Sequence, residues 1–198
     1  MTEPGAAAFY TRYAELYDRI ATDAPLVAGL RERVVDALDP DRGDVVVEMG
    51  CGTGANLPLL RDRVGPGGTV IGLDVSTGVL DRARARIERG GWTNVHVARA
   101  DATRPPLRPG DARAVGPVDG VLATFLTGML DDPAGAVDDW CRLAAGSTSS
   151  HPAGRVCVAG FARSTHPVGR RLNPVFSGLV RLASPPGRGR ATARERSP

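Results

Sequence analysis

The sequence predicts an α/β domain built on a doubly wound, mainly parallel sheet. Short apolar runs typical of buried strands alternate with amphipathic stretches of helical spacing along most of the chain. A glycine cluster at residues 50–54 directly follows the first of these runs. Acidic residues stand at, or just past, the predicted ends of three successive strands, where a parallel sheet forms its ligand-binding edge.

The elements of the N-terminal part follow from apolar spacing and from turn residues. Helical spacing predicts one helix over residues 9–20 and a second over residues 23–38, which stops before Pro40. Three consecutive valines indicate a buried strand over residues 44–49. The glycine cluster then leads into a predicted helix over residues 55–64.

The middle of the chain repeats the alternation. The run TVIGLD predicts a second strand over residues 69–74. A helix is predicted over residues 76–89, with Ser76 or Thr77 as its cap and two glycines after its end. A third strand is expected over residues 94–98.

The C-terminal part supplies two more strands and two more helices. A loop rich in Pro, Gly and Arg over residues 101–117 precedes the fourth strand, which is predicted over residues 118–123. An Asp-Pro pair opens a helix over residues 132–145. The fifth strand is expected over residues 155–161, and an amphipathic stretch over residues 168–183 is expected to pack on the sheet.

Composition excludes several classes of protein. The 198 residues are 42% hydrophobic, so the chain can build a core of ordinary size. No apolar run approaches the ~20 residues that a membrane-spanning helix needs, and the N-terminus does not resemble a signal peptide, so a cytoplasmic protein is expected. Three widely spaced cysteines form no CxxC motif, and no metal site is expected.

The net charge of +3 comes from the last fifteen residues, 184–198, which carry four arginines and one glutamate. The part before them is formally neutral, so the basic balance does not indicate nucleic-acid binding. We therefore expect one domain over residues 1–183, with residues 1–40 as an N-terminal helical cap. Residues 184–198 are expected to form a disordered Arg-rich tail.

The segment EMGCGTG, residues 48–54, is the strongest indication of a binding site. Glycines at a strand-to-helix turn allow a tight bend and a close approach of a ligand to the backbone. The same glycines also satisfy a dinucleotide fingerprint, and Asp74 lies near the spacing expected of a ribose-binding acid. Glu48 distinguishes the two alternatives, because a carboxylate at this turn repels phosphates and favours a cationic ligand.

Two further acids extend the predicted site along the edge of the sheet. Asp74 ends the second strand, where its carboxylate can accept two hydrogen bonds from a ribose diol. Asp101 follows the third strand and can accept a hydrogen bond from an adenine amino group.

Four segments, VVVEMGCGTG, VIGLDVS, ARADA and VDGVLATFL, give the chain a specific resemblance. Over roughly residues 10–161 it resembles class I S-adenosylmethionine-dependent methyltransferases of the small-molecule, quinone or phospholipid type. The resemblance implies a three-layer α/β/α Rossmann-like methyltransferase fold with S-adenosyl-L-methionine as the cofactor. The acceptor would be a small molecule, a lipid or a quinone. The implied cofactor-binding residues are Tyr17, Glu48, Gly50, Cys51, Gly52, Gly54, Asp74, Val75, Asp101, Ala102 and Thr124.

The chain departs from this family after the fifth strand. Members usually carry a further helix and an antiparallel strand pair there, and residues 184–198 lack the alternating apolar pattern of such strands. We therefore expect the C-terminal strand pair to be absent and the sheet edge to be open or closed by a second subunit in a homodimer. No catalytic base is evident in the sequence. Two alternatives remain, an NAD-dependent oxidoreductase on the same fold and a catalytically incomplete S-adenosylmethionine-binding protein.

Overall fold

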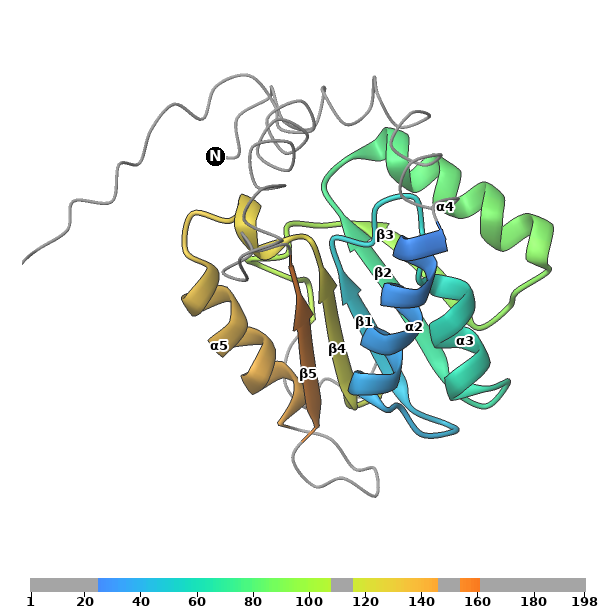
Figure 1. Cartoon of the computed structure of the whole chain (residues 1–198), viewed down its shortest axis with the longest axis horizontal. Helices are drawn as coiled ribbons and strands as arrows, with labels where there is room; N and C mark the ends of the chain where they lie inside the picture. The colour runs from blue at the N-terminus through green and yellow to red at the C-terminus, as the bar shows by residue number, and fades with distance from the viewer. Residues whose placement is uncertain (1–24, 108–115, 146–153, 161–198) are drawn as a thin grey trace, which may run out of the picture.

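The computed structural model describes residues 25–107, 116–145 and 154–160 and shows a parallel sheet between two layers of helices (Figure 1). The strands are β1 Val45–Met49, β2 Thr69–Asp74, β3 Val95–Arg99, β4 Gly120–Thr124 and β5 Arg155–Ala159. The helices are α2 Pro25–Leu38, α3 Leu57–Val64, α4 Thr77–Gly90 and α5 Pro133–Ala144, with a short 3-10 turn at Thr127–Met129. These elements agree with the predicted order and, within about two residues, with most of the predicted bounds.

The sheet has the order β3-β2-β1-β4-β5, and every strand pair in it is parallel. The chain runs outward from β1 through β2 to β3, then crosses to the other side of β1 for β4 and β5. This order creates a switch point between β1 and β4, where helices leave the sheet in opposite directions. The carboxyl ends of β1 and β4 are thus the expected place for a ligand.

Two apolar cores, one on each face of the sheet, hold the layers together. On one face the side chains of β1 and β2 pack against α5, whose Trp140 is fully buried. On the other face, the alternate residues of the same strands pack against α2, α3 and α4. Burial on both faces explains why the central strands are mostly apolar, with Glu48 in β1 as a buried charged residue.

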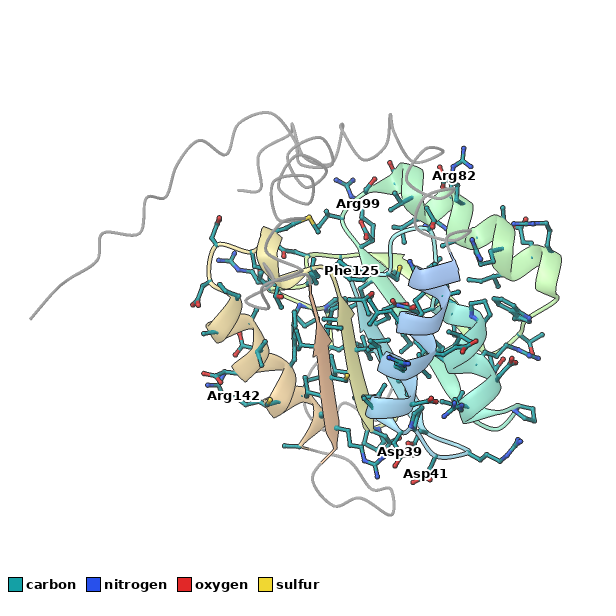
Figure 2. The ribbon with its side chains drawn as sticks, in the orientation of Figure 1. Asp39, Asp41, Arg82, Arg99, Phe125 and Arg142 are labelled. Atoms are coloured by element: carbon teal, nitrogen blue, oxygen red, sulfur yellow. The ribbon has the colours of Figure 1, made fainter. Side chains whose placement is uncertain are left out.

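Different side chains lie at the two ends of the strands, which form two opposite edges of the sheet. Asp39 and Asp41 lie at the edge where the strands begin, whereas Arg99 and Phe125 lie at the edge where they end (Figure 2). At the first edge Asp119 accepts a hydrogen bond from the backbone N–H of Val45 at 2.8 Å. Asp119 lies just before β4, so this acid links the beginnings of β1 and β4, at the opposite end of these strands from the expected ligand site.

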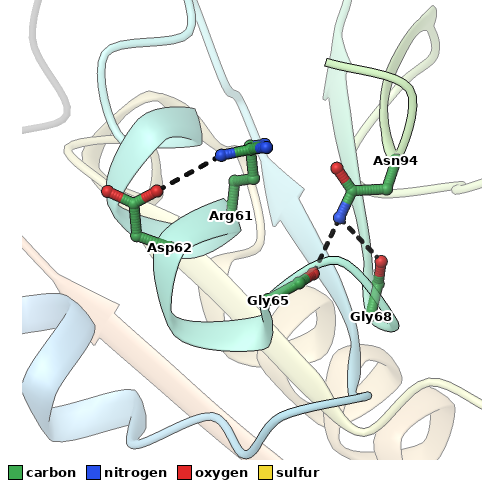
Figure 3. Close-up of polar contacts among 5 residues, drawn as sticks. All are labelled: Arg61, Asp62, Gly65, Gly68 and Asn94. Atoms are coloured by element: carbon green, nitrogen blue, oxygen red, sulfur yellow. Dashed lines mark hydrogen bonds and ion pairs between the residues drawn. The ribbon is translucent and has the colours of Figure 1, made fainter.

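Asn94 holds the turn between α3 and β2, at the end of the sheet where the strands begin. Its Nδ2 donates hydrogen bonds of 2.9 Å to the carbonyls of both Gly65 and Gly68 (Figure 3). A Cβ at Gly68 would lie 2.7 Å from the carbonyl oxygen of Asp44, so only glycine fits that position. The two hydrogen bonds of Asn94 fix the start of β3 against the start of β2.

One helix begins later than predicted, and another lacks the expected side-chain cap. The helix predicted from residue 55 begins at Leu57, because Asn56 occupies the N-cap position and its side chain bonds elsewhere. Ser76 occupies the N-cap position of α4 as predicted, but its side chain makes no capping hydrogen bond. Its backbone N–H instead donates to Asp74, at 2.9 Å.

Several predictions fall outside the described residues. These are the helix over residues 9–20 with Tyr17, the helix over residues 168–183, the tail and the expected absence of a C-terminal strand pair. None of the helices that the structure describes combines the length and apolar composition that crossing a bilayer requires.

Candidate cofactor site

A pocket opens at the switch point, beyond the carboxyl ends of β1 and β4. It has an empty volume of about 290 Å³, including its open mouth. Five of the predicted site residues line it, namely Glu48, Gly50, Cys51, Gly52 and Thr124. Four further residues complete it, namely Arg31, Thr53, Ala55 and Phe125, of which Thr53 lies inside the predicted binding segment 48–54.

The glycine loop exposes backbone toward this pocket. Gly50, Gly52 and Gly54 all have positive φ, a conformation that glycine adopts without strain. A Cβ at Gly54 would lie 2.7 Å from Cδ1 of Leu57, so this glycine is required by packing. Among the described residues, no atom lies within 4 Å of the place where a Cβ of Gly52 would be, so this part of the structure leaves room for a ligand beside a pocket-lining residue.

Glu48 is a buried acid in the pocket wall, with 1% of its surface exposed. Its Oε1 accepts a hydrogen bond of 2.6 Å from Nδ2 of Asn56. The same Nδ2 donates to Oγ1 of Thr124 at 3.0 Å, and Oδ1 of Asn56 accepts from Nη1 of Arg31 at 2.9 Å. Oε2 of Glu48 is buried without a hydrogen-bond partner among the described residues. A buried carboxylate oxygen in this state favours a ligand that carries a donor or a positive charge.

Glu48 gains or loses its proton near neutral pH. Burial raises its pKa to about 7, while the hydrogen bond from Asn56 and the positive charge of Arg31 act in the opposite direction. The negative charge of Asp74 adds a smaller rise. Glu48 is therefore not the fixed negative charge that its place in the sequence suggests, because burial of the side chain raises its pKa.

The stability of the protein should therefore depend on the protonation of Glu48. An acid with a raised folded-state pKa favours folding when protonated, so unfolding free energy falls as pH rises from about 4.5 to about 7. The full fall is about 3 kcal/mol. We expect Glu48→Gln to lack this fall in chemical denaturation measured from about pH 5 to about pH 8. The exposed Asp62→Asn should keep the wild-type profile, and parallel wild-type and Glu48→Gln profiles would contradict the prediction.

Asp74 joins the end of β2 to the glycine loop. Its Oδ2 accepts a hydrogen bond of 3.0 Å from the backbone N–H of Gly52, and its Oδ1 accepts one from that of Ser76. Burial raises the pKa of Asp74, and these backbone donors oppose the rise. A carboxylate has about four acceptor positions, so both oxygens can still accept from a ligand diol.

Asp101 and Ala102 form a tight turn after β3. Oδ1 of Asp101 accepts hydrogen bonds from both the backbone N–H and the hydroxyl of Thr103, at 2.9 and 2.8 Å. The carbonyl of Ala102 accepts a hydrogen bond of 2.8 Å from Nε1 of the buried Trp140. Asp101 and Ala102, like Asp74 and Val75, are outside the set of residues that line the pocket. Their part in binding rests on their position along the same sheet edge.

The turn after β4 is the strained part of the site. Phe125 has a φ of 59°, which side chains rarely adopt, and its N–H donates to the carbonyl of Ala159 at 2.7 Å. The next residue, Leu126, lies against Gly50, whose Cβ would be 3.0 Å from Leu126 Cδ1. The turn therefore packs over the glycine loop, and strain at a binding edge is typical of functional positions.

This strain can be measured with two small replacements of Phe125. Phe125→Gly and Phe125→Ala both remove the ring, but only alanine keeps a Cβ at positive φ. We expect the glycine variant to be more stable than the alanine variant by about 1 kcal/mol. Thermal unfolding of the two variants measures this difference. Equal melting temperatures, or a more stable alanine variant, would show that the turn is not strained.

The structure shows what the sequence analysis missed. Arg31 lies on the buried stripe of α2 that continues with Val34, Val35 and Leu38, and it is 9% exposed. A charged residue at that spacing is a signal for a specific role. Asparagine is favoured at the N-cap position of helices, and Asn56 occupies this position before α3. This preference is a sequence signal for the start of α3.

Two further candidate site residues are Cys51 and Tyr17, and the structure describes only the first. Burial raises the pKa of the Cys51 thiol well above its usual value, and its Sγ would lie 2.8 Å from a Cβ at Gly72. Cys51 thus packs between the loop and β2, as an inert thiol does. Tyr17 lies outside the described residues. In the described ranges, no His, Cys, Asp and Glu side chains gather in a way that could hold a metal ion.

A parallel sheet of this order, with a glycine loop and acids at its carboxyl edge, defines a Rossmann-like nucleoside-binding protein. Within that class, the chain belongs to the methyltransferase domain family, which it matches over residues 46–144. The match begins in β1 and ends at the last residue of α5, so it includes the glycine loop, Asp74, Asp101 and Thr124.

Two curated methyltransferases show the sequence similarity. The chain is 30% identical over 151 residues to nocamycin O-methyltransferase from Saccharothrix syringae, covering 76% of this chain and 49% of that protein. It is 29% identical over 159 residues to 2-phytyl-1,4-naphtoquinone methyltransferase from Thermosynechococcus vestitus, covering 78% and 64%. The chain therefore spans about half to two thirds of the length of these curated relatives.

A solved structure shows the same fold. The chain superposes on a SAM-dependent methyltransferase from Aquifex aeolicus with a TM-score of 0.57 and 18% identity, covering 81% of this chain and 76% of that one. The predicted class I methyltransferase family and its α/β fold are confirmed. S-adenosyl-L-methionine is the cofactor of this family, so the cofactor prediction agrees with the family match.

Proposed function

We propose that this chain transfers a methyl group from S-adenosyl-L-methionine to a small organic acceptor. The observation that carries the proposal is the pocket wall at Glu48. There, within the described ranges, a buried carboxylate oxygen of Glu48 has no hydrogen-bond partner and lies in the same pocket wall as Gly52, beside which no atom blocks a ligand. These features fit the methionine part of the cofactor, which carries an ammonium group and a sulfonium but no phosphate.

The other predicted residues have complementary roles in this proposal. Asp74 accepts hydrogen bonds from the ribose diol while its backbone partners hold the loop. Asp101 accepts from the adenine amino group. When bound, the cofactor supplies an electrophilic methyl group, so the chain's own work is to orient both reactants and to exclude water. Thr124 and Phe125 lie at the pocket edge where an acceptor would enter.

The acceptor class rests on the relatives. Their names describe an O-methyltransferase and a quinone methyltransferase, and another relative is a phosphatidylethanolamine N-methyltransferase. We therefore place the acceptor among small molecules, lipids and quinones. The NAD-dependent alternative has no support from the family match, whereas a catalytically incomplete S-adenosylmethionine-binding protein remains an outcome of the test.

The test is a product assay for S-adenosylhomocysteine with phenolic, naphthoquinol, amine and phospholipid acceptors, and with protein and RNA in parallel. We expect acceptor-dependent product with one of the small acceptors and a loss of product in Asp74→Ala. Labelling of protein or RNA alone would overturn the acceptor class. Binding of S-adenosylmethionine without turnover on any acceptor would favour the incomplete protein, and binding of NAD alone would favour the oxidoreductase.

A further inference from the structure

We infer that Arg31 is a positioning residue, which acts through the amide of Asn56 to hold Glu48 ready for a positively charged ligand group. The inference rests on the proposed function, because the ligand group is the ammonium of the cofactor. Arg31 itself would act on Glu48 through Asn56 and not by gripping the ligand.

The first argument is the direction of the hydrogen bonds. An asparagine amide has one acceptor end and one donor end, and the two ends are not interchangeable in this network. Nη1 of Arg31 can only donate, so its bond to Oδ1 fixes which end of Asn56 faces α2. The donor end then faces Glu48 and Thr124, as the 2.6 and 3.0 Å contacts show.

The second argument is the state of the acid. Asn56 uses Oε1 of Glu48 and leaves Oε2 buried without a hydrogen-bond partner in the described part of the chain. A reversed amide would instead place an oxygen against the carboxylate and repel it. The orientation set by Arg31 therefore keeps one carboxylate oxygen occupied and the other available to a ligand donor.

The third argument is electrostatic. The ionisable groups that act on Glu48 are Arg31 from α2, Asp74 from β2 and Cys51 from the loop. Thr124 from β4, which accepts a hydrogen bond from Asn56, is neutral. Arg31 is the only cation among them within the described residues, and it lowers the pKa of Glu48 against burial and Asp74. Without Arg31, Glu48 would hold its proton to higher pH and would bind an ammonium group less well.

The experiment compares Arg31→Met, Arg31→Lys and Glu48→Gln with the wild type in calorimetric titrations of S-adenosylhomocysteine. We expect Arg31→Met to bind about tenfold more weakly at about pH 6 and nearly normally at about pH 9, as a rise of one pKa unit in Glu48 requires. Arg31→Lys keeps the charge and a donor, and should recover most of the loss at the lower pH. Glu48→Gln lacks the titrating acid, so its change of affinity with pH measures the titration of the ligand's own amino group. This change is subtracted from the profiles of the other proteins.

A second measurement needs no ligand. The fall of stability with rising pH that Glu48 causes in the wild type should move to higher pH in Arg31→Met, and in Arg31→Gln if the methionine variant does not fold. A loss of affinity that is equal at both pH values would overturn the inference, since it would mean direct contact with the ligand or a purely structural role. Failure of the wild type to bind at all would overturn the proposed function, and this inference with it.

Discussion

Replacement of Asp74 by alanine should weaken the binding of S-adenosylhomocysteine about a hundredfold, or roughly 3 kcal/mol. The proposed ribose diol would lose two hydrogen bonds to a charged acceptor, each contributing about 1.5–3 kcal/mol. The backbone N–H of Gly52 would also lose its partner at 3.0 Å, so the loop would be held less firmly. Isothermal titration on folded protein measures the change.

A ribose-modified ligand separates these two losses. The wild type should bind an analogue that lacks the 2′-hydroxyl more weakly than S-adenosylhomocysteine, whereas Asp74→Ala should bind the two ligands almost equally. Asp74→Asn keeps acceptor capacity without the charge and should show an intermediate loss, about tenfold. If Asp74→Ala discriminates between the ligands as strongly as the wild type, Asp74 acts on the loop alone and does not contact the ribose.

The central part of the fold was predictable because its signals are local. Composition alone predicts three of its elements. These are β1 from its valine run, the turn from its glycine cluster and β2 from the run TVIGLD. The helix predicted at the Asp-Pro pair is α5, and the side chain of Asp132 caps it by accepting a hydrogen bond from the N–H of Gly135 at 2.9 Å. Parallel pairing then followed from the alternation of strands and helices.

The polar network of the site was not predictable in the same way. Arg31 and Asn56 are 25 residues apart in sequence, and only the packing of α2 beside α3 brings them together. The raised pKa of Glu48 depends on burial from all sides, which no strand pattern reports. The sequence around Phe125 gives no sign of its positive φ, because that conformation belongs to the turn after β4, where the N–H of Phe125 donates to Ala159 at the end of β5.

A second large effect is expected at Trp140, which links the apolar core to the predicted adenine side of the site. Its indole is fully buried, and Nε1 donates a 2.8 Å hydrogen bond to the carbonyl of Ala102. Trp140→Phe would leave that carbonyl without its donor and open a cavity between α5 and the sheet. We expect a loss of about 2–4 kcal/mol in unfolding free energy. Chemical denaturation followed by circular dichroism measures this loss without relying on tryptophan fluorescence.

Trp92 provides the matched control, because it is half-buried on the opposite face and packs beside Arg61. Trp92→Phe removes the same atoms but should cost less than about 1 kcal/mol. Equal losses in the two variants would mean that the bond to Ala102 contributes little.

The same pair of variants tests whether this hydrogen bond also matters for binding. At a fixed concentration, a ligand that binds only the folded protein raises its melting temperature more when it binds more tightly. If the Trp140 indole holds the turn at Asp101 and Ala102 in its binding position, S-adenosylhomocysteine should raise the melting temperature of Trp140→Phe less than that of Trp92→Phe. An equal rise in both variants would separate the two roles, since the core contact would then stabilise the fold without shaping the adenine side of the site.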